Sequence, residues 1–196
     1  MSNESTDSGD AISLQFYDDV APLVNELGRA MSVALDQGHG AICVVADTTR
    51  LMLEEQLNKR GIDIDAVRSV GQYVSVDGDE ALNRICAGGT PNAGRFATVV
   101  GSVVDRVSAR YPSVWMYGEL AALMWTRGNQ DGAIELDRLW AAFSDTHPVC
   151  LCVAFPVEAL TWPVVIDALR EEVANQIREM AKGSAIALAI HYGPKH

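Results

Sequence analysis

Aromatic and acidic side chains occur in this sequence where an apolar, strand-like run passes directly into a helical pattern. Residues 15–19 read QFYDD, Asp47-Thr48 follows the run AICVVA, and Gly118-Glu119 follows VWMY. Phe155-Pro156 closes a fourth apolar run, VCLCVA. Aromatic rings can line an apolar ligand pocket, and a carboxylate can contact a ligand or a water molecule. The chemistry that these positions suggest is recognition of a small molecule.

A phosphate site is the first alternative, because strand–helix junctions of α/β proteins often hold phosphates. A P-loop requires GxxxxGK followed by Ser or Thr, so that backbone N–H groups and one lysine neutralise the phosphates. The three lysines are Lys59, Lys182 and Lys195, and none follows a glycine. Asp18 and Asp19 would repel a triphosphate, and no GxGxxG follows an apolar run. We therefore expect neither a P-loop NTPase nor a dinucleotide-binding protein.

Metal binding and nucleophilic catalysis have little support in the sequence. The four histidines are dispersed, and HExxH, paired CxxC and GxSxG patterns are absent. Cys150 and Cys152 share one face of a strand and could form half of a soft-metal site, but core packing explains them better. His147 could act as a base, although a lone loop histidine more often has a structural role. We expect no metal, no cofactor and no enzymatic activity.

The acidic and aromatic residues could instead have structural roles. Glu119 stands where a strand passes into a helix, so it could contact a ligand or stabilise a helix N-terminus. Asp18 or Asp19 could cap the helix that follows. Aromatic residues are frequently core residues, but a group near the strand ends favours a pocket. The aromatic residues considered are Phe16, Tyr17, Trp115, Tyr117, Trp125, Trp140, Phe155 and Trp162.

Hydrophobic periodicity predicts strands that alternate with helices. Runs that are apolar throughout are typical of strands covered on both faces. The expected strands are residues 12–17, 41–46, 72–77, 114–117, 149–155 and 184–192. The expected helices run from Asp18-Asp19 to Gly38, over 47–60, from 78 to the stop at Gly88-Gly89, and over 91–110, 120–127, 130–144 and 163–182, with a helix or turn within 61–70.

This alternation predicts the fold class and the position of the site. Strands that are apolar on both faces and separated by helices indicate a mostly parallel central sheet in a three-layer α/β/α fold. Ligands of such sheets bind outside the carboxyl ends of the strands. The segments 16–19, 47–49, 118–119 and 155–156 should all lie at that edge.

The charge of the chain bears on its partners and location. Acidic residues outnumber basic ones 26 to 15, for a net charge of −11. This charge disfavours direct binding of nucleic acid or of an anionic membrane surface. Residues 1–11 read as a disordered acidic tail, and residues 12–196 as a single domain. The absence of a signal peptide or long apolar run, together with cysteines read as reduced, favours a cytoplasmic location.

Four segments, in order, resemble one known family. They are QFYDD (15–19), GELAALMWTRGN (118–129), AIELDRLW (133–140) and THPVCLCVAFP (146–156). Together they resemble the MEDS domain, a methanogen/methylotroph sensory domain, over about residues 14–160. That family is similar in layout to KaiC-like RecA-type ATPases but lacks their nucleotide apparatus. By this resemblance, Tyr17-Asp18 is an aromatic and acidic counterpart of a P-loop, and Glu119 takes the position of the Walker B acid.

The resemblance implies a stand-alone sensory domain that binds a small, largely apolar molecule and relays the signal to a partner. The implied partner is a sensor kinase or a transcription or anti-sigma-type regulator, with a homodimer as a further option. Family members commonly carry a histidine shortly before the QFY-like motif, whereas Ser13 and Leu14 stand there in this chain. The expected ligand-binding residues are Phe16, Tyr17, Asp18, Asp47, Thr48, Tyr117, Glu119, Trp125 and Phe155.

Two other functions stay open at this point. The fold could serve as a protein-interaction module for dimerisation or docking, which a large exposed apolar patch on a helix would support. It could also retain residual nucleotide binding, although the sequence shows no phosphate site. The environment of Tyr17 and Glu119 is the observation that separates these alternatives.

Overall fold

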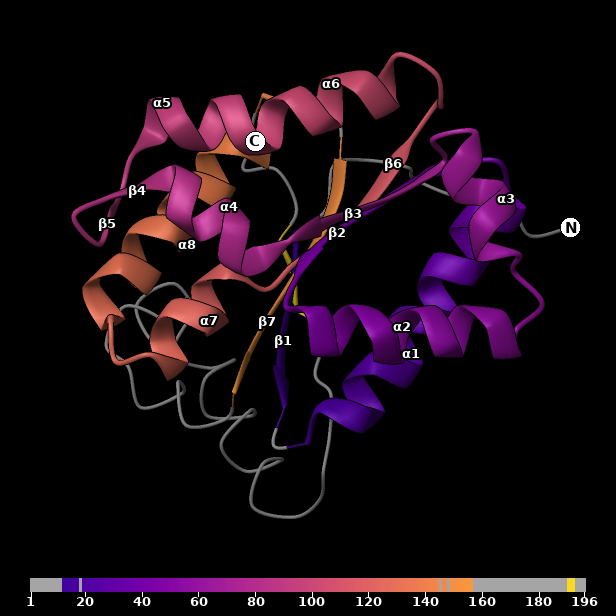
Figure 1. Cartoon of the computed structure of the whole chain (residues 1–196), viewed down its shortest axis with the longest axis horizontal. Coiled ribbons are helices and arrows are strands. Elements are labelled where there is room, and N and C mark those ends of the chain that lie inside the picture. Colours follow the sequence, from indigo (N-terminus) through magenta and orange to yellow (C-terminus); the bar gives the residue numbers. More distant parts are fainter. Residues whose placement is uncertain (1–11, 18, 145, 148, 157–189, 193–196) are drawn as a thin grey trace, which may run out of the picture.

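A parallel sheet forms the centre of the protein. The computed structural model describes residues 12–17, 19–144, 146–147, 149–156 and 190–192 (Figure 1). In this part of the chain the strands follow the order β3-β2-β6-β7-β1-β8, and only β8 runs antiparallel to its neighbour. The strands are β1 (Ile12–Tyr17), β2 (Gly40–Val45), β3 (Tyr73–Asp77), β6 (Val114–Gly118), β7 (Val149–Pro156) and β8 (Ile190–Tyr192).

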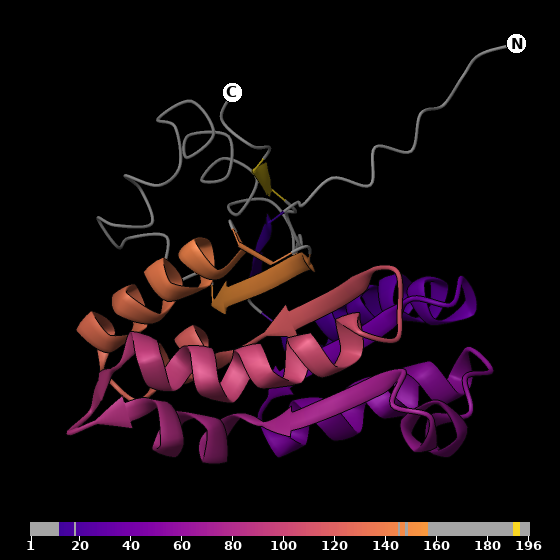
Figure 2. The same ribbon diagram turned by 90° about the horizontal axis from the view of Figure 1, so that it is seen from above.

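Helices cover both faces of the sheet, which confirms the three-layer α/β/α fold expected from the sequence. Figures 1 and 2 place α1 and α2 on one side of the sheet and α4 and α8 on the other. The first side is formed by α1 (Val20–Asp36), α2 (Asp47–Lys59) and α3 (Ile64–Ser69). The second is formed by α4 (Gly78–Ile85), α5 (Ala93–Phe96), η1 (Ala97–Gly101), α6 (Ser102–Ser108), α7 (Leu120–Thr126) and α8 (Gln130–Ser144).

Alternation along each strand divides the core into two clusters. On β6, Val114 and Met116 point to the α4–α8 side, whereas Trp115 and Tyr117 point to the side of α1 and α2. On β2, every residue is buried, as expected for a strand with helices on both faces. The strand β2 is therefore part of an interior layer of the protein.

The first helix begins and packs as the sequence predicts. Asp19 is the N-cap of α1, and its carboxylate accepts a hydrogen bond from the backbone N–H of Ala21 at 3.0 Å. The buried stripe of α1 includes Leu23, Leu27 and Met31, which recur at helical spacing. Gly38 ends this region with a φ of 79°, a conformation that favours glycine.

One expectation for the middle of the chain is wrong. Gly88-Gly89 does not end a helix: α4 stops at Ile85, and the two glycines form the turn between β4 (Cys86–Ala87) and β5 (Thr90–Pro91). Their φ values of 60° and 86° suit a two-residue hairpin turn. The Gly-Gly pair is compatible with such a turn, but the flanking strands are only two residues long, so the sequence shows no alternation on either side of it.

The helix expected over residues 91–110 is present as one continuous helical run over 93–108, but it is shorter than expected and is not α-helical throughout. Pro91 belongs to β5, Asn92 caps α5, and a π-helical segment, η1, separates α5 from α6. The wider π turn buries the consecutive residues Val99 and Val100, which a regular α-helical turn would spread over a wider arc. The expected helix at 163–182, residues 184–189 of the last strand and the tail at 1–11 lie outside the described residues.

Candidate functional site at the carboxyl ends of the strands

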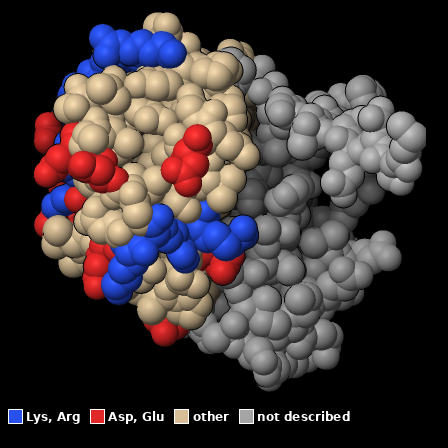
Figure 3. Space-filling view, turned by 90° about the vertical axis from the view of Figure 1, so that its right-hand side faces the viewer, with Lys and Arg blue, Asp and Glu red and all other residues tan. Residues whose placement is uncertain are grey.

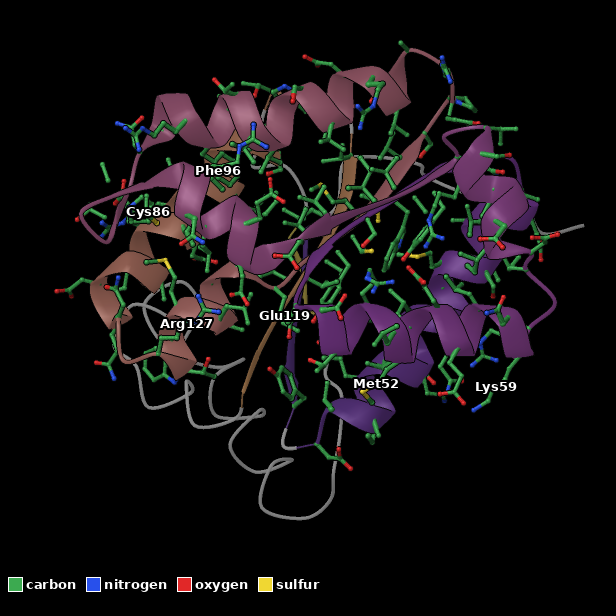
Figure 4. All side chains as sticks on the ribbon, in the orientation of Figure 1. Met52, Lys59, Cys86, Phe96, Glu119 and Arg127 are labelled. Carbon is green, nitrogen blue, oxygen red and sulfur yellow. The ribbon has the colours of Figure 1, made fainter. Side chains whose placement is uncertain are left out.

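Glu119 is the most closely held residue at the carboxyl end of the sheet. Its backbone N–H donates to the carbonyl oxygen of Val44 at 3.0 Å, which extends the pairing of β6 with β2 by one residue. One carboxylate oxygen accepts from the backbone N–H of Ala46 at 3.1 Å, and the other accepts from Oγ1 of Thr49 at 3.1 Å. Figure 4 shows Glu119 beside the first turn of α2. The side chain thus joins the end of β6 to the start of α2.

This arrangement gives Glu119 a structural role at a helix that lies far away in the sequence. Ala46 is the N-cap of α2 and has no side-chain acceptor of its own, and the Glu119 carboxylate accepts from the backbone N–H of Ala46, as the acid of a capping box does. Glu119 is only 7% exposed. Burial raises the pKa of its carboxyl group, and the bonds from Ala46 and Thr49 act in the opposite direction. The sequence suggested that Glu119 stabilises the helix that directly follows it. Glu119 is the N-cap of that helix, α7, but its side chain makes no cap bond there and instead bonds the start of α2.

Tyr17 and Tyr117 belong to the same cluster on the α1–α2 face. Tyr117 is 1% exposed, and burial, followed by the nearby Glu119, raises its pKa well above the usual value. Tyr17 is half-buried at the end of β1. β7 lies between the two tyrosine strands, since Tyr17 pairs with Pro156 and Tyr117 with Cys152. The two rings therefore share a face of the sheet but come from strands that are not neighbours.

The structure separates the other expected site residues. Asp47 and Thr48 are exposed in the first turn of α2, and Asp47 accepts a hydrogen bond from Nε of Arg50 at 3.0 Å. Trp125 lies on α7 and packs against the cluster on the opposite face, away from Tyr17. Asp18 and the side chains of Phe16 and Phe155 lie outside the described parts, although the backbones of Phe16 and Phe155 are paired in register.

A charged network that the sequence analysis missed lies between α2, α3 and the edge strand β3. Glu54 accepts hydrogen bonds from Arg50 at 3.1 Å and from Arg68 at 2.7 Å. The hydroxyl of Tyr73 donates to Glu54 at 3.4 Å and lies 3.1 Å from the thiol sulfur of Cys43. A polar cavity of about 310 Å³ adjoins this network. Its lining residues are Val45, Asp47, Arg50, Arg68, Ser75 and Asp77. Only the Arg50–Glu54 spacing of four residues hinted at this network in the sequence.

The structure does not support the metal-binding or base roles that the sequence analysis considered. Among the described residues, no group of three or more His, Cys, Asp or Glu side chains is placed to hold a metal ion. The ring of His147 stacks on Phe143 with centroids 3.8 Å apart, and its Nδ1 lies 3.0 Å from the carbonyl oxygen of Phe143. His147 thus packs against the end of α8 and does not lie at the carboxyl end of the sheet.

Comparison with known proteins assigns the chain to a family. A family model described as the methanogen/methylotroph, DcmR sensory domain (MEDS) matches residues 13–171, a longer span than the four sequence segments suggested. No curated protein and no solved structure gives a significant match. No helix in the described part of the chain is long and apolar enough to cross a membrane. The chain therefore belongs to the MEDS family of sensory domains.

Proposed function

We propose that this MEDS domain is a non-enzymatic sensor that binds a small, largely apolar molecule at the carboxyl ends of the strands and relays binding to a partner regulator. One observation carries the proposal. Tyr17, Val20 and Met52 are half-buried apolar residues that continue the core cluster out to the surface between α1 and α2. Figure 4 shows Met52 in this position. Apolar side chains left half-covered beside a strand end offer contact area to an apolar ligand.

The hydrogen bonds of Glu119 support recognition rather than catalysis at this edge. Both of its carboxylate oxygens accept bonds from α2, so the residue is held in a structural connection instead of facing a substrate. Asp19 is likewise engaged as the cap of α1. A base or a metal ligand at the same junction would need an oxygen that is available to the reacting group.

The same contacts offer a route for the signal. Tyr17 lies two residues before Asp19, the cap of α1, and Met52 lies in the second turn of α2. A ligand that contacts both side chains would favour one relative placement of these helices, and a partner that binds one placement better would sense the ligand. The partner class, a sensor kinase or a transcription or anti-sigma-type regulator, is part of this proposal.

Binding measurements on the whole chain test the proposal. We would titrate it by calorimetry with small alkanes, alcohols, ketones and haloalkanes, and with ATP as the competing class. Tyr17→Ala and Met52→Ala should weaken binding at least about tenfold, since each removes apolar contact area. Leu51→Ala is the matched control, because Leu51 neighbours Met52 on α2 but is 54% exposed. Absence of any saturable apolar ligand, or turnover of ATP, would contradict the proposal.

A further inference from the structure

The outer edge of β3 has no strand partner in the described part of the chain. β3 is the outermost strand of the sheet, and its pairing is with β2 alone. Figure 2 shows β3, in magenta, at the lower border of the molecule. Every residue of β2 is buried, whereas Tyr73 is the single buried residue of β3. The remaining residues of β3 are therefore accessible along this edge.

The pairing with β2 shows which backbone groups of β3 point outward. The N–H of Ala41 donates to the carbonyl oxygen of Gln72 at 2.7 Å, and Ala41 is opposite Tyr73 in the register. Successive residues of a strand direct their backbone groups to alternate sides. The even-numbered residues of β3 therefore bond β2, and the odd-numbered ones, Tyr73, Ser75 and Asp77, direct their N–H and C=O groups away from the sheet.

This edge lacks the features that usually prevent strand pairing. Edge strands in native proteins commonly carry a lysine, a proline or a bulge, or are very short. Residues 73–76 read YVSV, and β3 is as long as β6, which is paired on both sides. Val74 and Val76 are half-buried and extend the core cluster of the α4–α8 side to the edge. Such an uncharged, β-branched segment is suited to pairing with another strand.

A second, antiparallel copy of β3 would match the outward groups. If the two strands cross at Ser75, the two serines form a pair that exchanges both backbone hydrogen bonds. The N–H of Asp77 in each copy then meets the carbonyl oxygen of Tyr73 in the other. Val74 of one copy lies beside Val76 of the other, as an apolar cross-strand pair. This register uses all three outward residues, and a shifted register would leave one of them unpaired.

The charges beside β3 favour an antiparallel partner over a parallel one. Arg110 lies beside Gly71, just before β3, and its guanidinium contacts the carbonyl oxygen of Val70 at 3.5 Å. At the other end, the carboxylate of Asp77 accepts from the N–H of Glu80 at 2.7 Å, so two acids lie there. Antiparallel pairing places the basic end of one copy next to the acidic end of the other, whereas parallel pairing would place like charges together.

The net charge of −11 does not oppose this contact. Figure 3 shows basic and acidic side chains interspersed on the side of the molecule that carries α3, so the surface is not uniformly acidic. Charges that are separated by more than about 10 Å are largely screened at roughly 0.1 M salt. The short-range contacts along the edge therefore outweigh the repulsion between the two chains as a whole.

We propose that the outer edge of β3 is a homodimer interface, in which a second copy of this chain adds its own β3 in antiparallel order about a two-fold axis through Ser75. The axis is perpendicular to the sheet, so each helical layer stays on its own face and the sheet continues through the dimer. The inference goes beyond the proposed ligand site and does not depend on it, because β2, β6 and β7 separate β3 from Tyr17 on β1.

Sedimentation equilibrium and amide hydrogen exchange on the whole chain test the interface together. The dimer fraction should rise with concentration. On dilution to the monomer, the amide protons of Ser75 and Asp77 should exchange about tenfold faster or more, because their hydrogen bonds to the second copy are lost. The amide protons of Val74 and Val76, which bond β2, should not change. A chain that stays monomeric, or a dimer whose Ser75 protection is independent of concentration, would overturn the proposal.

A proline and an alanine at the centre of the edge form a matched pair of variants. Ser75→Pro removes the outward N–H but no bond to β2, and proline is tolerated at such edge positions. It should weaken dimerisation about tenfold or more, since two hydrogen bonds are lost per dimer. Ser75→Ala keeps the N–H and should dimerise normally. Far-ultraviolet circular dichroism confirms folding, and normal dimerisation of a folded Ser75→Pro chain would overturn the proposal.

Charge reversal tests the orientation without altering the strand itself. Arg110 is exposed, so Arg110→Glu should leave the fold intact and weaken dimerisation about two- to fivefold. Adding Glu80→Arg should restore part of the loss. Arg138→Glu makes the same charge change on an exposed residue of α8 and should leave dimerisation unchanged. Equal effects of Arg110→Glu and Arg138→Glu would overturn the antiparallel arrangement.

A different occupant of the edge would also be recognised. If the chain alone is monomeric and Ser75 becomes protected only when a regulator protein is added, the edge takes a strand from another protein and the homodimer is overturned. Tyr17→Ala should leave dimerisation unchanged, and Ser75→Pro should leave binding of an apolar ligand unchanged. Failure of this inference and failure of the proposed function can therefore be told apart.

Discussion

Polar side chains at the carboxyl ends of the parallel strands have different surroundings from those at the amino ends. At the carboxyl end, Glu119 is bonded to two groups at the start of α2, and Asp19 caps α1. At the amino end, a mostly apolar pocket of about 310 Å³ remains between α1 and the first residues of β6 and β7, and the buried Nδ1 of His39 has no partner among the described residues. In one case the polar side chains hold the secondary structure elements together. In the other, the elements leave space that only a small molecule or water can fill.

This difference shows that residue type alone does not mark a binding site. The acids at the carboxyl end attract attention in the sequence because they follow strands, yet the described ones are largely used within the fold. The amino-end pocket is lined by alanine, valine, tryptophan and cysteine, which in sequence look like core residues, together with four polar residues: Arg29, Gln37, His39 and Ser113. The function of a residue depends on which of its atoms still lack a partner after folding.

The largest effects on stability should come from a glycine at each end of the sheet. A Cβ on Gly40, at the amino end, would collide with Cγ1 of Val107, and a Cβ on Gly118, at the carboxyl end, would lie 2.9 Å from Cζ2 of Trp140. We expect Gly40→Ala to lower the free energy of unfolding by about 2–3 kcal/mol and Gly118→Ala by about 1–2 kcal/mol. Urea denaturation measures both.

Gly94→Ala is the control for this pair. Gly94 is an exposed residue of α5, where alanine should raise the free energy of unfolding slightly because it suits a helix better. If Gly118→Ala proved more damaging than Gly40→Ala, the carboxyl end would be the more tightly packed of the two.

Removal of the Glu119 carboxylate should be the next largest effect. Glu119→Ala leaves the N–H of Ala46 and the hydroxyl of Thr49 without this acceptor, and we expect a loss of about 1–2 kcal/mol in the free energy of unfolding. Glu119→Gln retains the shape and one acceptor and should cost less. If Glu119→Ala lowered the free energy of unfolding by less than the substitution of an exposed residue does, α2 would not depend on its hydrogen bonds to Glu119.

The cost of Glu119→Gln should also depend on pH. Because the folded-state pKa of Glu119 is raised above its reference value of 4.5, its contribution to stability is complete below that pH and declines as pH rises through the folded pKa. The variant should therefore lose more stability at pH 4 than at pH 7. Asp137, whose pKa burial raises to about 6, titrates in both proteins, so its effect cancels in the difference.

The smallest effects concern two surface acids of α1, Asp19 at its start and Glu26 near its middle. Asp19→Ala removes the cap at the carboxyl edge and should cost about 0.5–2 kcal/mol, because the N–H of Ala21 loses its acceptor. Glu26→Ala breaks the exposed pair with Arg29 near the amino-end pocket and should cost less than about 0.5 kcal/mol. Thermal unfolding of both variants measures the difference. If the two variants lost the same stability, the ion pair between Glu26 and Arg29 would contribute more than an exposed ion pair normally does.

Local patterns were enough to predict much of the fold. The apolar run at residues 41–46 matches β2, and the strand that ends at Tyr17 is followed by the expected cap at Asp19. These features depend on neighbours within a turn or a strand, where residue type and spacing carry the information. The hairpin at Gly88-Gly89 and the π-helical segment escaped prediction because their conformation is imposed by packing against other elements.

The candidate site was predictable only in part, for the same physical reason. Placing Tyr17, Tyr117 and Glu119 at one end of a parallel sheet requires only the strand boundaries and the topology. Assigning Trp125 to this group failed to anticipate that α7 packs on the opposite face. The connection between Glu119 and Thr49 spans 70 residues, so no local pattern could reveal it.

The sequence by itself determined the alternation of buried strands and amphipathic helices, the exclusion of a P-loop and the family to which the chain belongs, because each of these is encoded by residue type at short spacing. The tertiary structure decided which carboxylates are used within the fold, which face each aromatic ring joins, and where a hollow remains. These properties arise from contacts between distant segments, and strand register and helix packing bring those segments together.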